Sequence, residues 1–143
     1  MTLPSAAGRS FPPSIRGTFF SISVSDVDAV SRWYQANLGL RIVTSGMSGQ
    51  APNHVATFAL LEGNGFIVEI IQPAVSNART GRPFETRGIF KIGAIVEDLD
   101  GFLAALKQRG VPIAYDLMPL QELGMRCFML QDCEGNYLQF IGK

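Results

Sequence analysis

The sequence predicts an α+β fold in which two βαβββ modules share one core. The first observation is a duplication, because F-F-S-I-S-V-S-D-V-D (19–28) returns as F-K-I-G-A-I-V-E-D-L-D (90–100), and an internal repeat indicates repeated structural units. The second is that each copy passes from a period of two into a helical period that a glycine closes. The third is the length of 143 residues, which suits a single domain, so each copy forms half of it.

The elements of the first module can be justified in chain order. Residues 1–14 lack periodicity and predict a flexible arm before a domain at 15–143. Residues 19–24 alternate as a strand whose even positions face the helix. The helix begins where Ser25 or Asp26 accepts a backbone N–H and stops at Gly39, a residue suited to the left-handed conformation. Its apolar side holds Val27, Val30, Trp33 or Tyr34, and Leu38. Three strands then follow within 40–44, 53–61 and 66–72.

The second module, about 88–143, repeats the first, about 15–73. Asp98 begins its helix, Gly110 ends it, and the apolar stripe is Leu99, Phe102, Leu103 and Leu106. Strands follow within 112–115, 125–130 and 136–141, and an E-G-N turn precedes the last strand of each module. Matching the last strands needs an offset two residues smaller than matching the first strands, which predicts turns of different length.

The linker at 74–87 contains three arginines, Arg79, Arg82 and Arg87. A solvated basic loop is the favoured interpretation, because loops are exposed by default. The alternative is an anion clamp over a cleft.

Composition excludes several classes of function. Twelve Lys and Arg balance twelve Asp and Glu, so no net field favours nucleic acid or an anionic membrane. No apolar run is long enough for a signal segment or a membrane span, and we expect a cytoplasmic protein. Only two cysteines, Cys127 and Cys133, and one histidine are present, which argues against structural zinc and a disulfide framework.

The duplicated βαβββ pattern, the aromatic residue seven positions before a V-x-D helix start, and the D-x-x-G-N turn before the last strand resemble the vicinal oxygen chelate superfamily. This family contains glyoxalases, bleomycin-resistance proteins and extradiol dioxygenases. The resemblance implies a curled mixed sheet around a cavity, often completed by a second copy. We therefore expect a homodimer that binds a small molecule.

The resemblance also gives the positions of the family's metal ligands, on the first and last strands of each module. In this chain those positions are Phe19, Glu69, Lys91 and Gln139. Only Glu69 ligates a divalent cation well, since phenylalanine has no lone pair and an ammonium group repels the ion. We predict no metal and no cofactor.

Strand alternation predicts which side chains line the cavity face, opposite the helices. The chemistry is assigned to Glu69, as base or hydrogen-bond acceptor, and to Lys91, which would bind an anion; the alternative is an ion pair of purely structural significance. The predicted ligand-binding residues are Phe19, Ser21, Ser23, Cys127, Met129, Tyr137 and Gln139. Cys127 is interpreted as a small buried hydrophobe rather than a nucleophile.

His54 is the only imidazole, so any histidine chemistry must use it. It has the same strand parity as Phe58 and Leu60, which we expect to face the helix. A satisfied or solvent-edge histidine is the favoured interpretation.

Three functions follow, in this order. The first is a metal-free protein that sequesters a small molecule, as bleomycin-resistance proteins do. The second is a metal-independent isomerase or lyase acting next to a carbonyl, with Glu69 as base and Lys91 as anion stabiliser. The third is a glyoxalase-like metalloenzyme with a rearranged site that uses His54 together with Glu69.

Overall fold

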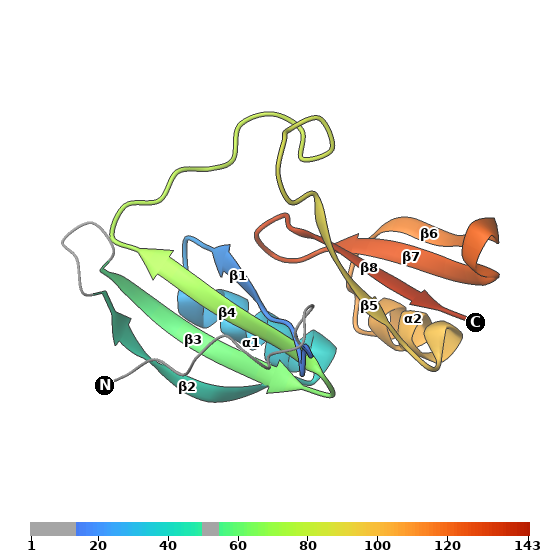
Figure 1. Cartoon of the computed structure of the whole chain (residues 1–143), viewed down its shortest axis with the longest axis horizontal. Coiled ribbons are helices and arrows are strands. Elements are labelled where there is room, and N and C mark those ends of the chain that lie inside the picture. The colour runs from blue at the N-terminus through green and yellow to red at the C-terminus, as the bar shows by residue number, and fades with distance from the viewer. Residues whose placement is uncertain (1–13, 50–54) are drawn as a thin grey trace, which may run out of the picture.

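Two modules of the same order, βαβββ, make up the structure, which is a computed structural model describing residues 14–49 and 55–143 (Figure 1). The first comprises β1 (Phe20–Ser23), α1 (Val27–Leu38), β2 (Arg41–Ser48), β3 (Ala56–Gly63) and β4 (Phe66–Pro73). The second comprises β5 (Lys91–Ile95), α2 (Leu99–Gln108), β6 (Ile113–Leu120), the short 3₁₀ helix η1 (Gln121–Leu123), β7 (Met125–Gln131) and β8 (Tyr137–Gly142). The predicted fold class is confirmed. The predicted arm, apart from its last residue, lies outside the described residues.

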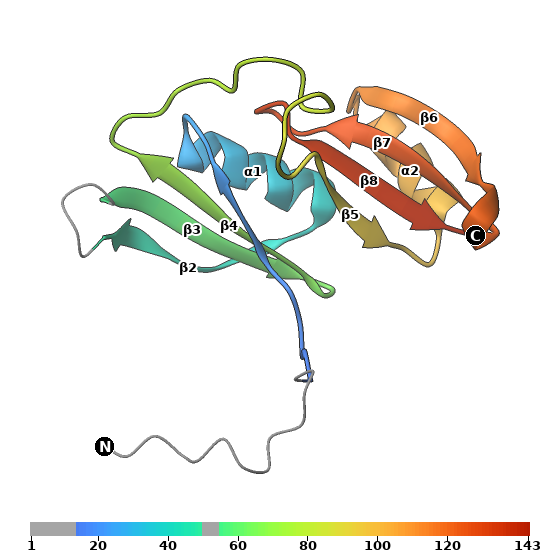
Figure 2. The same ribbon diagram turned by 45° about the horizontal axis from the view of Figure 1, so that its top comes forward.

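Each module forms a four-stranded mixed sheet with the same connections. The strand orders are β1-β4-β3-β2 and β5-β8-β7-β6, and the first strand of each module pairs in parallel with the last. A helix covers one face of each curled, open sheet (Figures 1 and 2). β1 and β5 are therefore the inner edges of the two sheets, and β2 and β6 are the outer edges.

The helix boundaries follow the predicted caps. Asp26 accepts a hydrogen bond from the Ala29 N–H at 2.9 Å, and Asp98 accepts one from the Gly101 N–H at 2.9 Å. Gly39 has φ 66°, in the left-handed region that glycine adopts without a Cβ clash, and ends α1. Between its two possible starts, α1 uses Asp26, and Tyr34 rather than Trp33 is the buried aromatic residue.

One core spans both modules, and its composition corrects one prediction. Ala59 and Leu61 of β3 are 3% and 0% exposed and pack toward α1. Phe58 and Leu60, predicted to face the helix, lie on the opposite face, since Leu60 is in register with Glu69. Both faces of β3 are apolar, so alternation could not give the phase of this strand. His54 lies outside the described residues.

The turn between β7 and β8 joins the two modules. The Asp132 carboxylate is 5% exposed and accepts a hydrogen bond from the Tyr34 hydroxyl of α1 at 2.7 Å. It also accepts bonds at 2.9 Å from the Glu134 N–H, the Asn136 N–H and the Asn136 side-chain amide. In the same turn, Glu134 accepts bonds from the backbone N–H and hydroxyl of Ser25. The D-C-E-G-N turn is thus a structural joint.

Neither α-helix in the described ranges combines the length and apolar content needed to cross a bilayer.

The Tyr34 hydroxyl gives the first prediction. Tyr34→Phe should lower the free energy of unfolding by about 1–2 kcal/mol, because Asp132 loses one buried donor and keeps the others. Tyr115→Phe is the control, since Tyr115 is 49% exposed and its change should stay within about 0.5 kcal/mol. Urea denaturation measures both variants, and equal losses would contradict the assigned role of Tyr34.

The same contact predicts a dependence on pH. Burial, and then the Asp132 charge, raise the pKa of Tyr34 above its ordinary value. The unfolded chain ionises this phenol near pH 10, whereas the folded chain keeps it neutral, so its contribution to stability is complete below about pH 10 and falls as pH rises further. Unfolding free energies measured on both sides of that pH should fall more steeply in the wild type than in Tyr34→Phe. Parallel curves would contradict this.

Candidate functional site

The candidate site lies on the sheet faces opposite the helices, called here the open faces. Strand register fixes which side chains they carry, because neighbours such as Val68, Ile70 and Leu138 are buried in the core on the other side. On the first sheet they include Ser21, Ser23, Phe58, Leu60, Ile67, Glu69 and Ile71; on the second, Lys91, Gly93, Cys127, Met129, Tyr137 and Gln139. The predicted strand residues thus lie on the open faces.

Glu69 is held in place by a neighbouring strand. Ser21 and Glu69 are in register across the parallel pair β1 and β4, and the Ser21 hydroxyl donates to a Glu69 carboxylate oxygen at 2.9 Å. Apolar side chains of β3 and β4, namely Leu60, Ile67 and Ile71, surround this pair on the same face. The contact orients the carboxylate.

Lys91 and Glu69 do not form an ion pair. Its ammonium lies 5.6 Å from the centroid of the Phe90 ring, within the range of a cation–π contact. It forms no ion pair with any carboxylate among the described residues. The two side chains come from different sheets, Glu69 from β4 and Lys91 from the edge strand β5, so the direct contact considered from the sequence is not formed.

On the open face of the second sheet, the polar side chain of Gln139 is buried. Gln139 is 9% exposed, and its amide donates to the Cys127 sulfur at 3.3 Å. Cys127 is itself buried, which agrees with a packing role. Met129 is in register with Gln139, and the three form a compact patch.

The family's metal positions do not fit a divalent cation in this chain. Phe19 is 64% exposed and has no donor atom, and Lys91 brings a positive charge. The amide oxygen of Gln139 is neutral, so Glu69 alone of these four positions offers an anionic oxygen. Within 14–49 and 55–143, no three His, Cys, Asp or Glu side chains come together in a way that would hold an ion.

A small cavity lies between the inner edge strands β1 and β5, and we call it the seam cavity. Its volume is about 110 Å³. It brings three predicted site residues, Ser21, Lys91 and Tyr137, together with Arg79 of the linker. Its full lining is Phe20, Ser21, Ile22, Arg79, Ile89, Phe90, Lys91, Ile92, Asn136 and Tyr137. Sequence reasoning missed Phe90 and Asn136 here. The only sequence signal for this cavity was the set of linker arginines, for which an anion clamp over a cleft was the alternative to a solvated loop.

An aromatic row continues from the seam cavity. Ring centroids are 5.4 Å apart for Phe84 and Phe90, 5.5 Å for Phe90 and Tyr137, and 6.5 Å for Tyr137 and Tyr115. The row runs from the linker across β8 to the outer strand β6. These residues are far apart in the sequence, and strand alternation identified only Tyr137.

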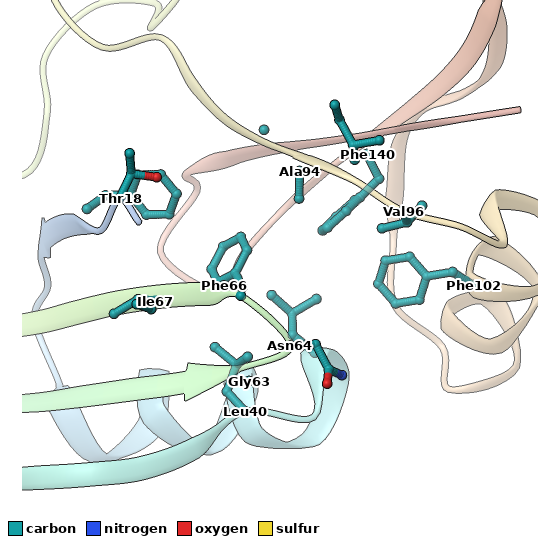
Figure 3. Close-up of a pocket in the computed structure, with 15 residues that line it drawn as sticks. Thr18, Leu40, Gly63, Asn64, Phe66, Ile67, Ala94, Val96, Phe102 and Phe140 are labelled. Atoms are coloured by element: carbon teal, nitrogen blue, oxygen red, sulfur yellow. The ribbon is translucent and has the colours of Figure 1, made fainter. Parts of the chain in front are cut away.

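A larger groove lies between the modules on the helix side (Figure 3). It measures about 440 Å³, and Phe66, Phe102 and Phe140 point into it. The β3–β4 hairpin that borders it turns over residues 64–65, whereas the β7–β8 turn spans 132–136 and packs against α1. The shorter turn leaves space beside α2, and the predicted difference in turn length is confirmed.

A third, polar cavity of about 800 Å³ is lined by residues that include Ser23, Arg79 and Glu134.

The comparisons with known proteins agree with this geometry. The family model of the Glyoxalase/Bleomycin resistance protein/Dioxygenase superfamily matches residues 18–140. No curated protein matches the chain.

Several solved structures have the same fold. A glyoxalase/bleomycin resistance protein/dioxygenase domain from Frankia sp. EAN1pec is 19% identical, with a TM-score of 0.73 over 90% of this chain and 93% of that one. The trypanothione-dependent glyoxalase I of Leishmania major is 23% identical, with a TM-score of 0.64 over 90% and 87%. The fosfomycin resistance protein FosX from Listeria monocytogenes, solved with Mn(II) and sulfate, is 15% identical, with a TM-score of 0.60 over 91% and 94%.

Proposed function

The chain belongs to the glyoxalase/bleomycin resistance protein/dioxygenase superfamily, and from that premise we propose that it sequesters a small amphipathic anion on its open faces without a metal ion. One observation carries the proposal: a lysine occupies a position where the family places a metal ligand. The positive charge of the site then comes from the Lys91 side chain. A ligand oxygen that a metal ion would bind in relatives is bound here by an ammonium group.

The open faces also offer apolar surface, including the part of the first sheet around Glu69. Phe58, Leu60, Ile67 and Ile71 lie on the open face of the first sheet, and ligand sites typically combine such a lining with a few polar groups. Ser21 and Glu69 supply polar atoms there, with the Ser21 hydroxyl proton donated to the Glu69 carboxylate. Together with the positive charge of Lys91, this lining favours a ligand with both apolar and acidic parts.

Sequestration is favoured over the metal-independent isomerase or lyase. That reaction needs a base and an anion stabiliser at adjacent atoms of one substrate. Glu69 and Lys91 form no ion pair in the described structure, and they come from different sheets. Binding needs no such contact between them.

The proposal predicts ligand binding that is independent of metal. We expect 8-anilinonaphthalene-1-sulfonate to saturate a single class of site, with a dissociation constant unchanged by EDTA. Lys91→Met should weaken binding by more than about fivefold, beyond the ~0–1 kcal/mol of an exposed ion pair. Lys107→Met is the control, because Lys107 pairs with Asp116 at 2.9 Å on another surface, and it should change nothing.

Two outcomes would contradict metal-free binding. Elemental analysis showing stoichiometric zinc, nickel, iron or manganese together with loss of dye binding in EDTA is the first. The second is equal dye affinity in the wild type and Lys91→Met, provided that circular dichroism shows both to be folded.

We also propose a homodimer. Every residue of the outer edge strand β2 is exposed, including Ile42, Val43 and Met47, and β6 exposes Met118 on the other outer edge. Unpaired strand edges with apolar side chains invite pairing with another chain. A second copy covering these edges would close a symmetric assembly.

Light scattering tests this assembly. The expected mass is twice the 15.5 kDa of the chain, and Val43→Lys should shift it toward one chain by placing a charge on the edge. Val75→Lys is the control, because Val75 is 80% exposed in the linker. A mass of one chain throughout a micromolar concentration series of the wild type is incompatible with the proposed dimer.

A further inference from the structure

We propose that the seam cavity is a carboxylate-binding subsite in which Arg79 of the linker acts together with Lys91, and that the ligand is an aromatic acid. The inference rests on the proposed binding function and specifies its ligand class.

The charges around the cavity are unbalanced. Arg79 and Lys91 both line it, and none of its lining residues is acidic. Neither Arg79 nor Lys91 forms an ion pair with a carboxylate among the described residues. Two cations beside one concave surface produce a positive potential that attracts an anion.

Neighbouring carboxylates are already bound elsewhere. Glu69 accepts the Ser21 hydroxyl, and Asp132 is satisfied by Tyr34 and by its own turn. Glu134, which lines the polar cavity that also contains Arg79, accepts two bonds from Ser25. Within 14–49 and 55–143, no carboxylate forms an ion pair with either of these two cations, and an anionic ligand would supply the partner.

The size of the cavity selects the anionic group. A volume of about 110 Å³ equals that of three to four water molecules at about 30 Å³ each. A carboxylate and the atom attached to it fit, whereas a fused ring system does not. An arginine can bind both oxygens of a carboxylate through two parallel hydrogen bonds, and a lysine adds a point charge. Tyr137, which makes no side-chain hydrogen bond among the described residues, can donate a third.

The aromatic row selects the remainder of the ligand. Phe90 and Tyr137 line the seam cavity, and Phe84 and Tyr115 continue the row beyond it. An aromatic ring attached to a carboxylate bound in the cavity would extend out of it and lie beside Phe90 and Tyr137. Offset or edge-to-face contacts at such centroid distances add stabilisation beyond simple burial, so an aromatic acid uses both parts of the site.

The decisive experiment compares an acid with its neutral counterpart. Titration calorimetry with 1-naphthoate and with 1-naphthalenemethanol is carried out on the wild type and on Arg79→Gln. For 1-naphthoate, Arg79→Gln should raise the dissociation constant about tenfold, the loss expected for a hydrogen bond between charged groups. The alcohol should bind more weakly to the wild type and be unaffected by the variant.

Arg82→Gln is the matched control, since Arg82 lies in the same linker and pairs with Glu85 at 3.8 Å. It should leave the naphthoate affinity unchanged. Equal naphthoate affinities in the wild type and Arg79→Gln would overturn the subsite. If the dye of the preceding section still binds in EDTA, the proposed function survives that result; if neither dye nor naphthoate binds, both proposals fail.

Discussion

The buried carboxylate of Asp132 is the contact on which the two halves of the protein depend. Four donors converge on it, from Tyr34 of α1 and from its own turn, so the β7–β8 turn has one shape and one place on the other module. A buried charge is tolerated only when it is satisfied in this way. Because the docked turn fixes the second module against α1, it also fixes how β1 and β5 face each other at the seam. The position of the β7–β8 turn on α1 thus influences the geometry of the candidate site, although the turn contact itself lies outside that site.

The modules are similar in topology and different in their contacts, and the difference places the cavities. The long turn of the second module fills the space beside α1, whereas the two-residue turn at Asn64 and Gly65 leaves the groove beside α2 open (Figure 3). A perfectly symmetric duplicate would have had the same cavity twice or not at all.

The sequence predicted the fold because its signals are local. Asp26, Asp98 and Gly39 define helix ends through contacts within a few residues, and the duplication ordered the strands. Prediction failed where neighbours decide: β3 is apolar on both faces, so its phase depended on pairing with β4. Alternation placed Glu69 and Lys91 on the open faces but could not give the distance between them. The seam cavity was missed because the linker, which has no period, contributes Arg79 to it.

The residues that hold the two modules together differ from those proposed to face a ligand, and their burial differs too. Asp132 and Tyr34 are buried, whereas Phe19 is 64% exposed and Lys91 is exposed on an edge strand. Substitutions at exposed positions usually change stability by no more than about 0.5 kcal/mol. Substitutions at the proposed ligand-facing positions should therefore cost little stability, whereas substitutions at the Tyr34–Asp132 contact between the modules should cost more.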